Sequence, residues 1–349
     1  MRGRAVVVGA GIAGLAVARG LVAGGWDVQV RERAGAPPGT GASLGMWPHA
    51  VTALERLGLG ELVRHGTVVA ASGELLRPDG RRLARVEPPG AMRLVGRPDL
   101  LSALADSLPD GVVRWGVRTS SVAGLPAADV LVAADGIGSV VRREVFGPAT
   151  APRGLGTVAV RGTANLPRPD LSETWGEGRM FGLTARVDGR TNVYACFRGT
   201  LAAPAEAADP VALLRRVFAG WHEAVRAAIE TLDPASLDVR ALQDLRPLPR
   251  TTRGNAVLVG DAAHAMAPNL GRGACESLVD AVVLADRLNC APDVATALRA
   301  YDRARRRPTA RLVRISRLLN RASTAEHLTG LRDGLLAAAG GVLAVGSRQ

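Results

Sequence analysis

The chain has 349 residues and a formal net charge of +12, which comes from 44 basic and 32 acidic residues. All 44 basic residues are arginine, and a chain without lysine cannot form a pyridoxal Schiff base or use a catalytic lysine amine. It also cannot build the lysine-dependent phosphate loop of common nucleotide hydrolases. Three scattered cysteines and five histidines without a close pair argue against a disulfide framework and against a metal site. We therefore expect a cytoplasmic protein with a sizeable core, built as two domains or one large α/β body.

The first elements in chain order form a strand, a helix and a second strand. Residues 5–8 are a short apolar run that predicts a buried strand, and Gly9, Gly11 and Gly14 follow it directly. Residues 15–23 then predict a helix, and residues 27–30 a second strand that leads to Glu32. This arrangement is typical of a dinucleotide site, in which the glycines let the backbone approach a pyrophosphate and the acid binds a ribose. A carboxylate at this point favours FAD or NAD, because it would repel the 2′-phosphate of NADP.

The elements that follow suggest two kinds of sheet. Short strands are expected within 67–95, and the later segments at 157–163, 179–187 and 191–197 indicate an antiparallel sheet. Further strands are expected at 112–117, 129–134 and 256–259, and helices at 51–57, 98–107, 210–232, 272–288 and 295–321, with Pro308 breaking or kinking the last one. The apolar run 334–346 is too short to span a bilayer and predicts a terminal packing helix.

Together these elements predict an α/β protein with a Rossmann-like nucleotide-binding domain, an inserted antiparallel-sheet domain and C-terminal helices. We expect the nucleotide-binding domain to comprise residues 1–66, 96–150 and 245–300. The inserted domain, a sheet plus a helix, is expected to comprise residues 67–95 and 151–244. Residues 301–349 would form the C-terminal helical segment.

Two later motifs also follow predicted strands. Asp135 and Gly136 come after the strand at 129–134, where the aspartate either contacts a cofactor or only caps the next helix. Gly260 and Asp261 follow the strand at 256–259, and an aspartate there can bind a ribitol hydroxyl. Pro268 and a glycine-rich helix start come next, and a helix N-terminus can stabilise the negative charge of a reduced flavin.

These three motifs, in this order, resemble those of the class A single-component FAD-dependent monooxygenases, the para-hydroxybenzoate hydroxylase-like aromatic hydroxylases. Segments 41–50, 95–100 and 175–182 are similar to that family's flavin-side loop, flavin-side arginine segment and substrate-domain strand. The resemblance implies these cofactor-binding residues: Gly9, Gly11, Gly14, Glu32, Arg33, Arg97, Asp135, Gly136, Gly260, Asp261, Pro268, Gly271, Arg272, Gly273 and Ala274. It implies substrate contacts from Leu44, Phe181, Tyr194, Cys196 and Pro268. The reaction would be centred on the flavin, with Arg97 and Pro268 beside it.

Some features of the chain leave alternatives open. Arg272 stands where many members of that family carry glutamine, and it either faces the flavin or points outward. His264 and Cys275 are expected to be structural rather than catalytic. Tyr194 and Cys196 alternate with Val193 and Phe197 along one strand, so one of these pairs should face the substrate.

The resemblance implies that the fold is a Rossmann-like FAD-binding domain with an inserted antiparallel-sheet substrate domain and C-terminal helices. It also implies an FAD-dependent monooxygenase with NADPH or NADH as a transient electron donor. It would hydroxylate an aromatic or polyketide-like small molecule with O2 through a flavin C4a-hydroperoxide, as in secondary metabolism. Epoxidation, Baeyer–Villiger oxidation or FAD chemistry without oxygen insertion are the alternatives. Residues 301–321 hold eight arginines and one acid, which raises nucleic-acid or partner binding as a further possibility. We expect instead a solvated arginine face, or arginines that face a cofactor or partner, on a monomer or homodimer without nucleic acid or a membrane span.

Overall fold

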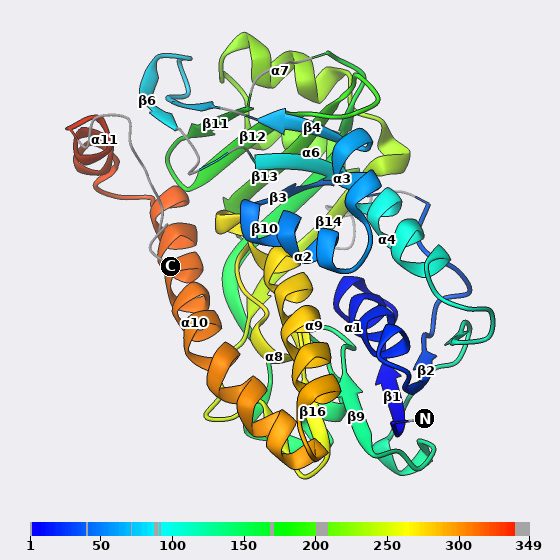
Figure 1. Cartoon of the computed structure of the whole chain (residues 1–349). Helices are drawn as coiled ribbons and strands as arrows, with labels where there is room; N and C mark the ends of the chain where they lie inside the picture. Colours follow the sequence, from blue (N-terminus) through cyan, green and yellow to red (C-terminus); the bar gives the residue numbers. More distant parts are fainter. Residues whose placement is uncertain are drawn as a thin grey trace.

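The computed structural model describes residues 2–39, 41–70, 72–86, 90, 92–167, 171–199 and 209–338 of the chain. Two large sheets dominate the molecule, and helices pack around them (Figure 1). None of the helices in this described part has the length and apolar content needed to cross a bilayer.

The first sheet has six strands in the order β15-β16-β9-β1-β2-β8, and all neighbours are parallel except β15 and β16. Its strands are β1 (Arg4–Val8), β2 (Asp27–Arg31), β8 (Val113–Arg114), β9 (Val130–Ala133), β15 (Thr252–Arg253) and β16 (Ala256–Leu258). Successive residues of β1 pack into cores on opposite faces, because both faces of a parallel sheet are covered. One of these cores includes side chains of α1 (Ile12–Ala23), α2 (Pro48–Arg56), α4 (Arg97–Asp106) and α9 (Gly273–Cys290).

The second sheet has seven strands in the order β14-β10-β13-β12-β11-β5-β6, and only β11 and β5 are parallel. These strands are β5 (Gly73–Leu76), β6 (Arg82–Val86), β10 (Arg153–Ala164), β11 (Leu171–Trp175), β12 (Arg179–Ala185), β13 (Thr191–Arg198) and β14 (Asp238–Asp244). Two helices, α6 (Pro210–Val217) and α7 (Glu223–Glu230), cover one face of this sheet. The prediction of a single helix at 210–232 is wrong, because Gly220 adopts a φ of +78° and separates the two.

A three-stranded sheet, β3-β7-β4, contacts both large parts of the molecule. Its strands are β3 (Ser43–Met46), β4 (Thr67–Ala70) and β7 (Met92–Gly96), and α3 (Gly60–His65) precedes β4. The Ser43 N–H donates to Asn192 Oδ1 of β13 at 3.0 Å, and the Cys275 thiol of α9 donates to the Gly45 carbonyl at 3.2 Å. β3 therefore lies against both the second sheet and the start of α9.

The C-terminal part consists of helices. The α10 helix (Val294–Ser323) runs through Pro308 without a break, so of the two predicted outcomes, a break or a kink, the break is wrong. Proline removes the donor to the carbonyl of Ala304, but both residues are exposed and water can take its place. The α11 helix (Thr329–Ala338) covers the beginning of the predicted terminal helix, and residues 339–346 lie outside the described residues.

Candidate active site

The glycine loop after β1 contains two kinds of glycine. Gly9 has a φ of +101°, and a Cβ there would overlap the Ala134 carbonyl. A Cβ on Gly14 would overlap the Gly9 carbonyl oxygen, so the packing of the chain itself requires both glycines. Gly11 has an ordinary φ of −77°, and a Cβ there would meet no atom within 4 Å. Its bare backbone therefore faces open space at the N-terminus of α1, which fits the approach of a pyrophosphate.

Glu32 lies beside this loop, as the sequence predicts. Its two carboxylate oxygens accept the N–H groups of Ala10 at 2.8 Å and Ala34 at 2.9 Å. Each oxygen keeps a further lone pair, so the carboxylate can still accept a ribose hydroxyl. The neighbouring Arg33 is exposed.

Asp135 follows β9 and caps the turn after it, because its Oδ2 accepts the Val140 N–H at 2.7 Å. Its Oδ1 is buried and has no hydrogen-bond partner among the described residues, so capping accounts for only one of the two oxygens. Gly136 has a φ of +76° and faces open space. The buried Arg142 donates to the carbonyls of Thr150 and Ala262, at 3.1 Å in each case, and so holds this loop to the one after β16.

The loop after β16 presents Asp261 at the surface. Gly260 has a φ of +55°, and a Cβ there would come within 2.8 Å of Ala13 and Ser277. Asp261 then begins the short α8 helix (Asp261–His264), and its exposed carboxylate accepts no hydrogen bond from the described residues. It is free to bind a hydroxyl of a ligand.

The start of α9 is open as well. Pro268 is exposed and begins a 3-10 turn, and Gly271 adopts the left-handed conformation with a φ of +61°. No side chain caps α9, so the N–H groups of Gly273 and Ala274 are available at its N-terminus. The helix dipole adds a partial positive charge there, which suits a ligand that becomes negative on reduction.

Arg272 is held by neighbouring side chains. Its guanidinium donates to Glu276 Oε1 at 2.7 Å and lies 3.1 Å from His49 Nε2. The side chain is half-buried, and Glu276 binds it along the helix. It is therefore part of a side-chain network rather than an isolated surface arginine.

This network continues beneath the loop after β16. Asp280 accepts the Nε–H of Arg305 at 2.6 Å and the N–H of Gly260 at 2.8 Å, and it lies 2.7 Å from His264 Nε2. Burial would raise the pKa of Asp280, but His264 and Arg305 outweigh burial and lower it. The sequence indicated a structural His264 but treated Arg305 as one of many surface arginines. The sequence does contain one indication of a buried basic partner, which is the pair of acids Glu276 and Asp280, four residues apart in an apolar helix.

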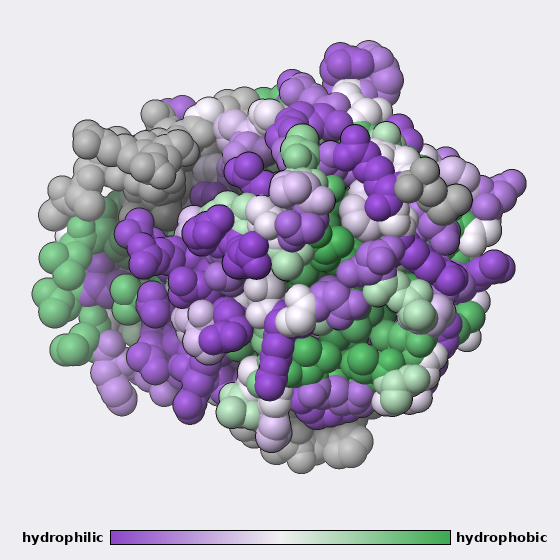
Figure 2. Space-filling model, turned by 60° about the horizontal axis from the view of Figure 1, so that its bottom comes forward, coloured by the Kyte–Doolittle hydropathy of each residue, from purple (hydrophilic) through white to green (hydrophobic). Residues whose placement is uncertain are grey.

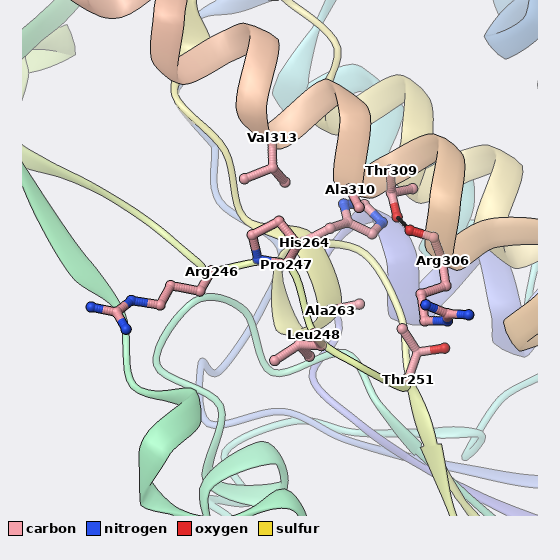
Figure 3. Close-up of a pocket in the computed structure, with 10 residues that line it drawn as sticks. All are labelled: Arg246, Pro247, Leu248, Thr251, Ala263, His264, Arg306, Thr309, Ala310 and Val313. Carbon is pink, nitrogen blue, oxygen red and sulfur yellow. Dashed lines mark hydrogen bonds between the residues drawn. The ribbon is translucent and has the colours of Figure 1, made fainter.

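A small cavity of about 10 Å³ lies next to His264 (Figure 3). It is lined by Arg246, Pro247, Leu248, Thr251, Ala263, His264, Arg306, Thr309, Ala310 and Val313. This volume holds about one water molecule, so the cavity is too small for a cofactor or substrate. His264 Nδ1 is buried and has no partner among the described residues, and a water in this cavity would be a suitable one.

The predicted substrate residues divide between the two faces of the seven-stranded sheet. Tyr194 lies between Asn192, which binds β3, and Cys196, which contacts Asn320 of α10. This face therefore points toward the glycine-rich loops. Phe181 lies on the opposite face, 1% exposed, with its ring centroid 5.1 Å from that of Phe218. The structure does not bring Phe181 to the others, and we leave it out of the site.

Tyr194 lies flat on the sheet. A Cβ on Gly182 would overlap its ring, so the missing side chain makes room for it. The Tyr194 hydroxyl donates to Glu173 at 2.8 Å, and the Trp175 Nε1–H donates to the other carboxylate oxygen at 2.9 Å. Burial raises the pKa of Glu173, against the effect of these two hydrogen bonds. Cys196 is a packed thiol, since burial raises its pKa to about 11.

Arg161 was not singled out from the sequence, although it interrupts an apolar strand. It lies opposite Tyr194 in β10, is half-buried, and has no hydrogen bond to another described side chain. Burial lowers its pKa, and repulsion by Arg240 and Arg97 acts in the same direction, whereas the carboxylates of Asp238, its other cross-strand neighbour, and Asp261 partly oppose this. Arg97 is exposed, yet partial desolvation of its guanidinium and repulsion by Arg240 lower its pKa too. Leu44 of β3 is half-buried.

The bare backbone at Gly11, the carboxylates of Glu32 and Asp261, and the uncapped N-terminus of α9 are features with which a parallel α/β sheet can bind a dinucleotide cofactor. The family model described as an FAD binding domain matches residues 113–316. The chain is 31% identical to the aurachin C monooxygenase/isomerase of Stigmatella aurantiaca, over 86% of this chain and 84% of the relative. It is also 31% identical to the FAD-dependent urate hydroxylase of Klebsiella oxytoca, over 86% and 85% of the two chains.

A solved structure is also similar to this chain. The Klebsiella pneumoniae HpxO protein, complexed with FAD and uric acid, superposes with a TM-score of 0.87 at 26% identity. The match covers 97% of this chain and 93% of that one. The chain therefore belongs to the family of FAD-dependent monooxygenases with an FAD-binding domain, and it is an oxidoreductase.

Proposed function

We propose that this enzyme uses NADPH or NADH and O2 to hydroxylate an aromatic compound that carries an acidic group. The observation that supports this substrate class is Arg161. An arginine stays charged at neutral pH, and a half-buried charge without a hydrogen-bonded partner favours binding of an anion. Its cross-strand neighbour Tyr194 offers a flat ring and a hydroxyl on the same face of the sheet. The Klebsiella relative is named for urate, which is itself an organic acid.

The residues that would hold FAD are those of the three loops. The backbone at Gly9, Gly11 and Gly14 would bind the pyrophosphate, Glu32 the ribose and Asp261 the ribitol. Asp135, Gly136, Arg33, Arg97 and Pro268 would surround the cofactor, and the N–H groups of Gly273 and Ala274 would face the flavin pyrimidine. Bound FAD supplies hydride acceptance and oxygen activation. The protein contributes positioning, the partial charge of α9 and a substrate face that includes Leu44, Tyr194 and Arg161.

The reaction class is tested with labelled oxygen. The FAD-loaded enzyme is given NADPH or NADH, ¹⁸O₂ and a panel of aromatic and polyketide-like acids. We expect one labelled oxygen atom to appear in a hydroxylated product. Turnover without oxygen consumption would refute the proposal, and a labelled epoxide or lactone would correct the reaction type.

The substrate class is tested by Arg161→Gln with an acidic substrate and its methyl ester. We expect KM for the acid to rise at least tenfold, which corresponds to about 1.4 kcal/mol, because the anion loses its charged partner. KM for the ester should stay the same, and flavin content should be unchanged. An equal rise for both compounds would mean that Arg161 only shapes the face.

The cofactor site is tested by Asp261→Ala. The side chain is exposed, so the fold should persist while the FAD dissociation constant rises by roughly tenfold or more, as expected for about 1.5–3 kcal/mol of hydrogen bonding to a charged group. Asp110→Ala is the matched control, since that aspartate is also exposed and has no hydrogen bond among the described residues. Full flavin occupancy in the Asp261 variant would contradict the assignment.

A further inference from the structure

The outward side of α10 is a row of arginines. Arg303, Arg307, Arg311, Arg314 and Arg321 are exposed, and none pairs with an acid among the described residues. Their spacing of three, four or seven residues places them along one side of the helix. Two other arginines of the helix, Arg305 and Arg317, pair with acids of other elements, and Arg306 pairs with Asp302 of α10 itself. The outward row therefore carries positive charge that the described part of the protein does not neutralise.

Apolar side chains are exposed within the same row. Ile315 is 42% exposed and Leu318 is 65% exposed. Leu318 lies four residues after Arg314 and three before Arg321, so on the helix surface it is enclosed by arginines. A single exposed leucine is common on protein surfaces and indicates no binding site, but further leucines are exposed on the neighbouring α11 helix.

The α11 helix packs Leu336 and a charged pair against the body of the protein and exposes its other leucines. Asp333 is 9% exposed and turns inward, and Arg332 donates to the carbonyls of Gly176 at 3.2 Å and Ala322 at 3.3 Å. Leu331 and Leu335 point outward and are 61% and 64% exposed. Leu328, just before the helix, is 75% exposed. Figure 2 shows an apolar group at the left edge, where Figure 1 has α11, next to a hydrophilic region. A surface helix that faces only water normally has the opposite pattern.

We propose that this α10–α11 surface, made of Arg311, Arg314, Ile315, Leu318, Arg321, Leu328, Leu331 and Leu335, binds the face of a bilayer that contains anionic phospholipids. A bilayer surface offers both partners that this surface needs. Its phosphates accept the forked hydrogen bonds of guanidinium groups, and its acyl boundary takes up leucine side chains. Nucleic acid would match the arginines but would leave the leucines without a partner. The helices would lie on the membrane and not cross it.

The test is sedimentation of the FAD-loaded enzyme with vesicles of phosphatidylcholine, with and without phosphatidylglycerol. We expect binding to the anionic vesicles that weakens as salt rises. Arg311→Gln/Arg314→Gln/Arg321→Gln and, separately, Leu331→Ser/Leu335→Ser should each weaken it at least tenfold. These side chains are exposed, so thermal unfolding and activity in solution should not change. Matched controls that should bind normally are Arg114→Gln/Arg118→Gln/Arg143→Gln and Val69→Ser/Val187→Ser, which alter exposed side chains elsewhere.

Three results would overturn the proposal. One is equal binding to neutral and anionic vesicles, or equal loss of binding in the variants and their controls. Another is a dimer that dissociates in the leucine variant without any vesicle binding, which would assign the surface to a second copy of this chain. The third is a DNA duplex that binds through the same arginines regardless of the leucines, while vesicles do not bind.

Discussion

The glycines of the loop after β1 are needed for different reasons. Gly9 and Gly14 are required by contacts within the chain, whereas Gly11 meets nothing and has an ordinary φ. A glycine that the fold does not need indicates that something else needs the space. This distinction cannot be read from the spacing of the motif, because all three glycines look alike there.

Substitution of Gly11 separates these two roles. Gly11→Val should leave the stability of the apoprotein nearly unchanged, because the side chain points into open space. It should raise the FAD dissociation constant at least tenfold, or about 1.4 kcal/mol, since the pyrophosphate can no longer approach the backbone. Gly14→Ala is the contrasting variant and should unfold at much lower denaturant concentration. Flavin fluorescence titration and denaturant unfolding measure the two effects, and normal FAD binding by the Gly11 variant would contradict the role proposed for the loop.

Gly182 provides a second residue-level prediction. Gly182→Ala places a methyl group where the Tyr194 ring lies, so the ring must leave the sheet. We expect KM for the substrate to rise roughly tenfold, about 1.4 kcal/mol, with unchanged FAD binding. Tyr194→Phe keeps the ring in place, so KM should rise less than in Gly182→Ala. The lost hydrogen bond to Glu173 should lower the free energy of unfolding by about 1 kcal/mol. Steady-state kinetics would refute the role of this face if Gly182→Ala left KM unchanged.

The sequence singled out candidate residues that belong to local motifs, and it did not single out candidates that stand alone within a strand. Glu32 and Asp261 follow predicted strands, so their positions could be inferred from the pattern. Arg161 and Glu173 each stand alone within a strand, and their meaning depends on which strand lies beside them. Phe181 was misplaced for the same reason: alternation along a strand shows two faces but not which one a helix covers.

At the scale of elements, α8, α9 and α10 are joined by the buried carboxylates of Glu276 and Asp280. Asp280→Asn should lower the free energy of unfolding by about 3–5 kcal/mol, because Arg305 would keep a buried charge without its full partner. Arg303→Gln is the control on the same helix, and its effect should stay within about 0.5 kcal/mol because this side chain is exposed. Urea unfolding of both variants is the measurement. Equal losses would show that the network contributes nothing specific.

The same network predicts a dependence of stability on pH. Burial alone would lower the pKa of His264, but the Asp280 carboxylate and its hydrogen bond outweigh burial and raise it above 6.5. The charged pair therefore stabilises the fold fully below about pH 6.5, and this stabilisation is lost as the pH rises through the folded-state pKa. The difference in Tm between the wild type and His264→Asn should be largest near pH 6 and should shrink toward about pH 9. A difference that grows with pH would contradict the raised pKa.

The presence of helices was predicted better than the residues at which they begin and end, or the elements that they contact. Patterns of apolar residues indicated α9 and α10, but not that α10 continues through Pro308 or that Gly220 separates α6 from α7. Both outcomes depend on solvent access and backbone conformation rather than on hydrophobic spacing. The position of β3 against Asn192 also depends on contacts between distant segments.

For the whole molecule, the sequence predicted two kinds of sheet and their order along the chain. Every strand of the six-stranded sheet falls within residues 1–66, 96–150 and 245–300, although the limits of the domains remain a prediction. The order of strands within each sheet could not be inferred. It is set by long-range pairing, for example of β1 with β9, which lies more than one hundred residues later.

This order of strands has a consequence for synthesis of the protein on the ribosome. Gly9 packs against the Ala134 carbonyl, and Ala13 packs against Gly260. The N-terminal segment therefore cannot complete its packing until these later residues have been translated. At about 5–20 residues per second, roughly 15–60 s pass between the emergence of β1 and that of Arg305. During this interval β1 exposes apolar faces, and the flavin pocket is incomplete. We therefore expect FAD to bind only after the late segments have folded, and we expect the nascent chain to be prone to aggregation until then.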